Sequence, residues 1–289
     1  MLTNEIIGKR SDVFSVSYTW RDIILYAIAV GAKQDDLDYV FEKNLKVLPT
    51  FGTLPCFATI GVTPTKPESL HYLVEEYITD SAGLHMEHEL IMHRQFNPMG
   101  GDFTFQTEIA ALYDRGPGKG AVRTERIVMY DNEGNAICTN NANLILLGEG
   151  GFGGDQMPKS DVLIPGRAPD IELDDALSPE QHLIYRLTGD TNNVHVDPEA
   201  ARREGVDRPF MHGLCSFGYV CRMAVGALMP GQPEKMTRIA AQMRSILFPG
   251  SSIRLQLWDK DPGSAYFRLL NLSNDNALIL ERGIIEWTP

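Results

Sequence analysis

The chain has 289 residues, of which 43% are hydrophobic and 22% are charged, and its formal net charge is −12. This composition is typical of a globular protein with enough apolar residues for a sizeable core. The excess of negative charge argues against a protein that binds nucleic-acid phosphates. An anionic ligand would need a local basic patch.

Targeting and membrane-spanning signals are absent from the sequence. Residues 1–10 mix charged residues with short apolar pairs, unlike a signal peptide. The longest apolar stretch, Ile23–Ala32, is about half as long as a helix that crosses a bilayer. Glu286–Pro289 is not a peroxisomal signal of the S-K-L type. We therefore expect no membrane partner and a cytoplasmic location, with the peroxisome as the alternative.

The four cysteines form no C-x-x-C pair, and each lies in an apolar setting. This pattern predicts buried, reduced thiols and a reducing compartment. The four are Cys56, Cys138, Cys215 and Cys221.

Helices followed by four strands are predicted for the first half of the chain. A short apolar helix over residues 23–31 ends at Gly31, and a small-residue helix is predicted over Phe51–Ile60. Runs rich in Thr, Ile, Val and aromatic residues follow, with turn signals between them. These predicted strands are Leu84–His93, Gly101–Tyr113, Ala121–Tyr130 and Ala136–Leu147.

The second half repeats this order after a linker over residues 148–169. Ser178 and Pro179 predict the start of a helix that leads to Tyr185. A further helix is predicted from about Gly213 to Leu228. The predicted strands are Arg238–Phe248, Ser252–Asp259, Ala265–Leu272 and Ala277–Trp287.

The repeated order of elements indicates a duplicated fold. Tyr26 and Tyr185 lie in matching helices, Phe51 and Phe210 precede matching helices, and both pairs are 159 residues apart. We predict an α+β fold of two units, residues 1–147 and 170–289, joined by the linker. The alternative is a single merged domain.

A dense polar segment distinguishes the second half from the first. Asp190 and His195 follow a helix break at Gly189, whereas the first half has Ala32-Lys33-Gln34 there and no histidine. An acid and an imidazole that share a water can take a proton from it and deliver one to carbon. The duplication therefore predicts chemistry in the second half and a substrate pocket shaped by the first.

Each of these polar residues also has a purely structural interpretation. Asp190 could form an Asx-turn, with His195 as a solvated loop histidine. Asn192 could orient a water molecule or cap the loop, and Asp197 is expected to cap the next helical turn. A metal site built on Asp190, His195 and Asp197 is less favoured, because no further ligand set is evident.

The start of the predicted helix at Gly213 supplies a possible oxyanion donor. Its backbone N–H, without a partner in the helix, could bind a thioester oxygen as negative charge builds on it. The alternative is a glycine required only for close packing. Cys215 and Ser216 lack the sequence context of a nucleophile.

Two apparent motifs carry no function. The G-x-G-x-x-G run at Gly148–Gly153 is not followed by a predicted helix, which argues against a dinucleotide site. His88–His93 has one residue too many between Glu89 and His93 for the zinc motif, and we predict a strand there.

Two segments resemble the hydratase 2 motif of the MaoC-like (R)-specific enoyl-CoA hydratases. They are Tyr185-Arg-Leu-Thr-Gly-Asp190-x-Asn192-x-x-His195-x-Asp197-Pro198 and Pro209-x-x-His212-Gly213-Leu214-Cys215-x-Phe217-Gly218. A looser resemblance, to the hydratase 2 unit of peroxisomal multifunctional enzymes of β-oxidation, covers nearly the whole chain. It includes Arg21-Asp22, Leu84-His85-x-Glu87, Asp114-x-Gly116 and Gly150–Gly154.

This resemblance implies a double hot-dog fold and reversible addition of water to trans-2-enoyl-CoA, without metal or organic cofactor. It implies that Asp190 and His195 are the acid–base pair, that Asn192 positions the water, and that the Gly213 N–H binds the thioester oxygen. A homodimer and an acyl-CoA thioester substrate are also implied. The implied substrate contacts are His85, Met86, Arg115, Thr191, Asn193, Val194 and Met243.

The chain departs from the family pattern near these contacts. Asn193-Val194 replaces the usual Pro-Leu, and Met86 and Met243 replace a glycine and a phenylalanine. Arg115 replaces a lysine and keeps the positive charge for a CoA phosphate. Two other functions are weighed against the hydratase: an acyl-CoA thioesterase of the hot-dog type and a non-catalytic acyl-CoA-binding module.

Overall fold

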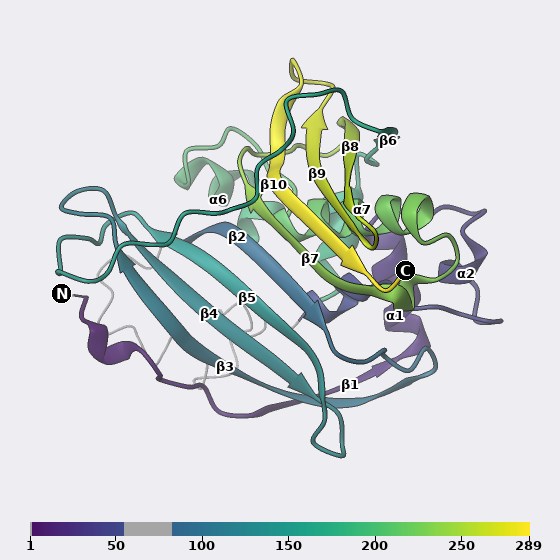
Figure 1. Ribbon diagram of the computed structural model, residues 1–289, viewed down its shortest axis with the longest axis horizontal. Coiled ribbons are helices and arrows are strands. Elements are labelled where there is room, and N and C mark those ends of the chain that lie inside the picture. The colour runs from purple at the N-terminus through teal and green to yellow at the C-terminus, as the bar shows by residue number, and fades with distance from the viewer. Residues whose placement is uncertain (1, 55–82) are drawn as a thin grey trace.

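The computed structural model describes residues 2–54 and 83–289, and Figure 1 shows their arrangement. Within these residues, one antiparallel ten-stranded sheet has the order β1-β3-β4-β5-β2-β7-β10-β9-β8-β6. The first-half strands are β1 Phe14–Thr19, β2 Gly83–Met92, β3 Gly100–Asp114, β4 Ala121–Tyr130 and β5 Ala136–Leu146. The second-half strands are β6 Ile171–Ala176, β7 Met236–Met243, β8 Ser252–Asp261, β9 Ser264–Asn271 and β10 Ala277–Trp287.

The strand order confirms the predicted duplication. Read from its two ends toward the middle, the sheet runs β1-β3-β4-β5-β2 and β6-β8-β9-β10-β7, the same sequence of counterparts. The halves meet where β2 pairs with β7, from Glu87 opposite Gln242 to Ile91 opposite Arg238. The predicted unit boundaries, at residues 1–147, 148–169 and 170–289, stay predictions.

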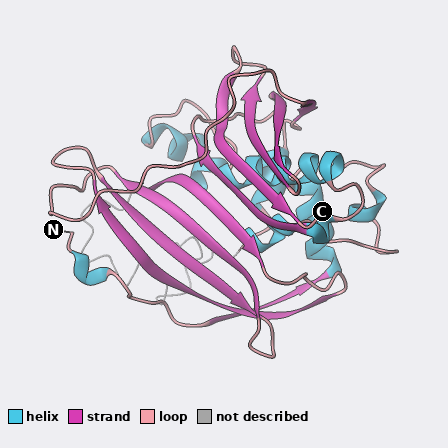
Figure 2. Ribbon diagram, in the orientation of Figure 1, coloured by secondary structure: helices cyan, strands magenta, loops and turns pink. Residues whose placement is uncertain are grey.

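Most helical residues lie beside the second-half strands, as Figure 2 shows. The α-helices are α1 Trp20–Ala29, α2 Leu37–Val40, α5 Gln181–Arg186, α6 Pro198–Arg203 and α7 Gly213–Leu228. The 3-10 turns are η1 Asn4–Ile6, η2 Pro49–Thr53, η3 Asn193–His195 and η4 Pro233–Lys235.

Helix α1 begins at Trp20, three residues before the predicted start, and the chain turns at Gly31 as predicted. Thr19 and Asp22 form a reciprocal capping box that satisfies backbone N–H groups at its start. At its end Gly31 has φ +86, and a side chain there would overlap the ring of Tyr219. The glycine therefore permits both the left-handed turn and the close approach of α7.

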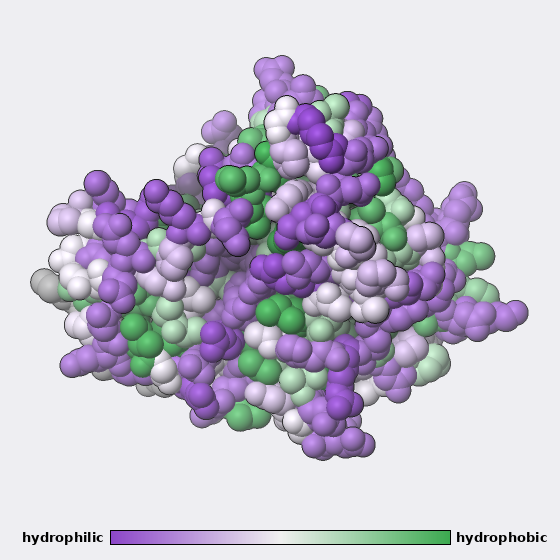
Figure 3. Space-filling view, viewed as in Figure 1, coloured by the Kyte–Doolittle hydropathy of each residue, from purple (hydrophilic) through white to green (hydrophobic). Residues whose placement is uncertain are grey.

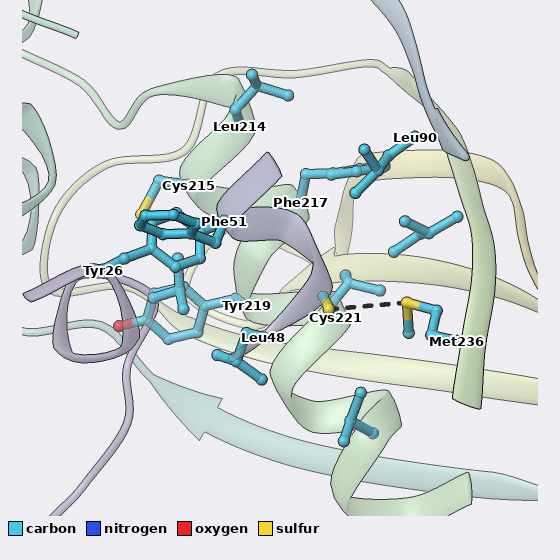
Figure 4. Packing of buried hydrophobic residues seen from close by; sticks show 14 of the residues in the cluster. Tyr26, Leu48, Phe51, Leu90, Leu214, Cys215, Phe217, Tyr219, Cys221 and Met236 are labelled. Carbon is cyan, nitrogen blue, oxygen red and sulfur yellow. Dashed lines mark hydrogen bonds between the residues drawn. The ribbon is translucent and has the colours of Figure 1, made fainter. Parts of the chain in front are cut away.

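The long helix α7 forms the centre of the core. Eleven of its 16 residues are buried, and Figure 4 shows its side chains packed against Tyr26, Leu48 and Phe51 of the first half. A side chain at Gly218 would overlap the side chain of Val30, so the bare backbone of α7 makes room here for a side chain of the first half. Burial of this continuous apolar surface supplies most of the drive for folding.

Cysteines add to this packing. The Sγ of Cys221 lies 3.8 Å from the Sδ of Met236. Cys138, Cys215 and Cys221 are buried and free, as predicted, whereas Cys56 lies outside the described residues. Most of the helix predicted over residues 51–60 also lies outside them.

Strand β7 ends earlier than predicted, at Met243 rather than Phe248. Its pairing with β2 ends at Gln242, and beyond it the chain turns so that Leu247 O accepts the N–H of Met211 at 2.8 Å. The apolar run after Met243 therefore packs on the segment that precedes α7. Strands β1 and β6, at the two edges of the sheet, were not predicted.

The molecular face in Figure 3 is largely hydrophilic, with apolar residues in small groups. Among the residues that the structure describes, no helix has the length and apolar character needed to cross a bilayer.

Candidate active site

The segment Gly189–His195, here called the acid–base loop, follows the end of α5 and includes the turn η3. Gly189 has φ +143, a conformation that permits the abrupt break after the helix. Asp190 and His195 are only 4% and 7% exposed, although the loop between them reaches the surface. The loop therefore directs both polar side chains inward.

Burial makes the carboxyl of Asp190 a weaker acid than that of an exposed aspartate. Desolvation raises the pKa of its carboxyl from 3.8 to about 6, opposed by the backbone N–H of Asn192 and by the charge of Arg186. The Asn192 N–H donates to Oδ1 at 3.1 Å. Near neutral pH this carboxylate is ionised, yet its affinity for a proton is much higher than that of an exposed aspartate.

His195 is held as a neutral imidazole. Its Nδ1 lies 2.9 Å from Phe210 O, and because a carbonyl only accepts, Nδ1 is the protonated nitrogen. Burial lowers the pKa of His195 to about 4. The hydrogen bond to Phe210 raises this pKa, and the charge of His182 lowers it further. The Nε2 lone pair is left available as a proton acceptor.

His212 was missed by the sequence prediction, although it stands inside the second motif segment. It precedes α7, and its Nε2 donates to Asp190 O at 3.2 Å. Its ring centroid lies 3.7 Å from that of His195, with 31° between the planes, and 4.8 Å from that of Tyr185. Burial, chiefly, lowers its pKa to about 2.

The two histidines and the aspartate converge. One nitrogen of each ring and one carboxylate oxygen of Asp190 all lie within 4.8 Å of one another. That spacing suits a shared water molecule. The expected absence of a metal stays a prediction.

Gly213 lies directly beside this cluster, at the first position of α7. The first N–H groups of a helix have no partner within it and carry the positive end of its dipole. A Cβ at Gly213 would lie 3.5 Å from the Sδ of Met243. Two predicted site residues therefore lie next to each other, and the lack of a side chain leaves the amide accessible.

Other loop residues have structural tasks. The Oδ1 of Asn192 accepts the N–H of Val194 at 3.3 Å and so caps η3, which is the alternative interpretation of this residue. Its role toward water stays a prediction. Thr191 and Asn193 lie in the same loop. Asp197 accepts the N–H of Glu199 at 2.8 Å, which confirms its predicted capping of the next helix.

Strand β2 brings His85 and Met86 toward α7. The His85 ring lies 5.2 Å from that of His88, which lies 5.4 Å from the ring of Phe217. Glu87 of β2 pairs with Gln242 of the antiparallel β7. Met86 precedes Glu87 and Met243 follows Gln242, so both methionines lie on the same side of that pair. The pKa of His85 is lowered to about 4 by burial, so it is neutral at physiological pH.

Arg115 lies in the turn between β3 and β4, exposed to solvent. The carboxylate of the preceding Asp114 accepts the N–H groups of Gly116, Gly151 and Gly153 at 2.7 to 2.8 Å. These bonds, that to Gly151 foremost, lower the pKa of Asp114. The glycine-rich run thus anchors the turn and, as expected, begins no helix. Contact of Arg115 with a substrate stays a prediction.

Comparison with known proteins identifies the fold family. Residues 16–148 match the family model of the MFE-2 hydratase 2 N-terminal domain, and residues 161–274 match that of the MaoC like domain. The chain is 33% identical, over 294 residues and 97% of each sequence, to 3-hydroxyacyl-thioester dehydratase Y of Mycobacterium tuberculosis.

Two solved structures give the same result. A MaoC-like dehydratase from Phytophthora capsici superposes with a TM-score of 0.87 at 27% identity, over 99% of this chain and 98% of that one. A Mycobacterium tuberculosis protein described as a double hotdog fold gives 0.61 at 14% identity, over 96% and 95%, which concerns the fold alone. The predicted double hot-dog fold is confirmed, and the chain belongs to the MaoC-like hydratase and dehydratase family of hydro-lyases.

Proposed function

We propose that the protein is an (R)-specific enoyl-CoA hydratase, and in reverse a 3-hydroxyacyl-CoA dehydratase, of fatty acyl-CoA metabolism. The observation that carries the proposal is the buried Asp190–His195 pair beside the first N–H of α7. The name of the dehydratase relative, which acts on 3-hydroxyacyl thioesters, agrees with it. The (R) configuration follows from the resemblance of the motif.

The reaction adds one water molecule across the C2=C3 bond of a trans-2-enoyl thioester. A water held between Asp190 and His195 gives a proton to the pair, and its oxygen bonds to C3. Negative charge then moves to the thioester oxygen, where the N–H of Gly213 stabilises it. The pair returns the proton to C2, so it ends in its starting state and no other reactant is needed.

The acidities suggest how the proton moves. With pKa values of about 6 and about 4, Asp190 is ionised and His195 is neutral at pH 7. This supports the hypothesis that Asp190 accepts the proton of water. His195 can donate to carbon only after that proton has reached it, because it holds no second proton beforehand.

The remaining assignments are proposed on the resemblance. Asn192 positions the water, and the acyl-CoA contacts are His85, Met86, Arg115, Thr191, Asn193, Val194 and Met243. We also propose a homodimer, a site that needs no cofactor, and a cytoplasmic rather than peroxisomal location.

Crotonyl-CoA tests the function directly. A hydratase removes the absorbance of the conjugated double bond without releasing thiol, and the product should be (R)-3-hydroxybutyryl-CoA. Release of free CoA thiol would instead identify a thioesterase. Saturable binding without either signal, for crotonyl-CoA and for longer enoyl-CoAs, would identify an acyl-CoA-binding module.

A further inference from the structure

His212 has no part in the proposed proton transfer, yet it lies in the centre of the site. It is 1% exposed, and its side chain makes no capping bond to α7. Among the described residues its Nδ1 is one of the buried polar atoms that lack a hydrogen-bond partner. A buried acceptor without a partner is unfavourable. Capping therefore does not explain a histidine here.

The side-chain hydrogen bond of His212 joins two parts of the site. Its Nε2–H donates to the backbone oxygen of Asp190, while its own backbone leads directly into Gly213. The acid–base loop is thereby tied to the residue that precedes the proposed oxyanion donor. Movement of the loop relative to α7 would break this bond.

The ring of His212 supports a second catalytic group. It stacks on His195 at 3.7 Å and contacts Tyr185 at 4.8 Å. The other end of the His195 ring is fixed by Phe210 O. The stacking ring excludes water from one face of His195 and limits rotation of its imidazole.

We propose that His212 is the positioning residue of this site, which holds the Asp190 backbone through its Nε2–H and the His195 ring through stacking. The inference rests on the proposed function. Both reacting groups are thereby fixed relative to Gly213, as catalysis by proximity requires.

The charges around His212 favour its neutral form, in which the ring donates one N–H to Asp190 O. His195 and, on α5, His182 and Arg186 are the ionisable groups that act on it electrostatically, while Asp190 acts through its backbone oxygen. A proton on His212 would add a positive charge near that of Arg186 and is disfavoured by burial. We therefore expect no titration of His212 in the range where the protein is folded.

Two substitutions separate the bond from the ring. His212→Gln keeps an amide N–H that can reach Asp190 O but loses the ring. His212→Phe keeps the ring but loses the N–H. In each variant the Asp190 carboxyl carbon and the His195 ring nitrogens are titrated by NMR without substrate, and kcat and KM are measured with crotonyl-CoA.

We expect a different response from each variant. In His212→Phe the freed loop lets water reach Asp190, so its pKa falls from about 6 toward 3.8 and the acid limb of kcat moves with it. In His212→Gln the pKa of His195 rises from about 4 toward 6.5. In both, kcat falls by about 10- to 100-fold, with a smaller change in KM.

His88→Gln is the matched control. His88 is also 1% exposed and has an unpartnered Nδ1, but its contacts are Asn140, His85 and Phe217 rather than the acid–base loop. It should lower stability and leave both pKa values unchanged. If neither pKa moves in either His212 variant, the inference is wrong. Because the titrations need no turnover, a wild-type protein that hydrates no enoyl-CoA would refute the proposed function alone.

Discussion

The two halves of the molecule use the same helix break for different purposes. After α1 the chain turns at Gly31, and the following Lys33 forms an ion pair with Asp175 of β6. After α5 it turns at Gly189 and places Asp190 in the site. The residues after the first break therefore form an ion pair between the two halves, and those after the second include the proposed acid–base pair.

Two aspartates with largely covered side chains show the physical difference. Asp175 is paired with Lys33 and with Arg222, whose Nε also donates to Val30 O at 2.9 Å. Burial raises its pKa, but these partners outweigh burial and the pKa is lowered from 3.8. For Asp190 burial prevails and the pKa is raised to about 6. Removal of a buried acid with full partners leaves those partners unpaired, whereas a buried acid without them is available for proton transfer.

The largest expected effect is on turnover and concerns His195 in the second half. His195→Gln keeps a polar side chain but removes the imidazole that shares the proton, so kcat should fall by about 100- to 10,000-fold. Lys33→Ala, in the matching segment of the first half, should leave kcat nearly unchanged. Steady-state kinetics with crotonyl-CoA measure both, and equal losses would show that the halves do not divide these tasks.

The next effect concerns the oxyanion donor at the start of α7. Gly213→Pro removes the N–H at a position where proline is compatible with a helix start, and His212 already has the extended φ −61 and ψ 135 favoured before proline. We expect kcat to fall by about 100- to 1,000-fold. Gly213→Ala keeps the N–H and is the control. Similar activities of the two variants would remove Gly213 from the mechanism.

Stability should change in opposite directions at the two aspartates. Asp175→Asn leaves Arg222 buried without its counter-charge and should lower the free energy of unfolding by about 3 kcal/mol. Asp190→Asn removes a desolvated carboxylate, whose rise in pKa from 3.8 to about 6 corresponds to a gain of up to about 3 kcal/mol at pH 7.

The gain at Asp190 should depend on pH. A raised pKa means that the folded protein holds the proton more tightly, so the cost of Asp190 is full above pH 6 and disappears below about pH 4. Denaturant unfolding of wild type and Asp190→Asn at pH 7 and pH 4 measures this. A gain that is equally large at both pH values would mean that burial does not penalise the Asp190 carboxylate.

The smallest effect is the acid limb of the wild-type reaction. As Asp190 takes up a proton, kcat/KM should fall by about tenfold for each pH unit below 6. Asp175, with its lowered pKa, should not titrate in this range. A limb near pH 4 would indicate a solvent-exposed carboxylate in the free protein.

The main strands could be predicted because turn residues in the sequence mark where each one begins and ends. Turn residues before Ala121 and after Tyr130 define β4, whose observed bounds equal the predicted ones. The edge strand β6 was missed because it is short and acidic, with Glu172, Asp174 and Asp175, and is held by pairing with β8 rather than by propensity.

The candidate site was predictable only in part. Asp190 and His195 were indicated by a glycine break followed by two residues with proton-transfer chemistry. His212 was not, because its importance comes from a stacking contact and a bond across 22 residues of sequence, and neither has a local pattern. The capping bond of Asn192 likewise depends on the turn that the loop adopts.

Crotonyl-CoA hydration by Asp190→Asn and Asp175→Asn, side by side, tests the central claim most directly. Both variants replace one buried aspartate with its neutral isostere, at a temperature where both remain folded. We predict that Asp190→Asn loses turnover by about 100-fold or more, while Asp175→Asn keeps a kcat close to wild type. Near-normal turnover by Asp190→Asn would contradict the assignment of the acid–base pair.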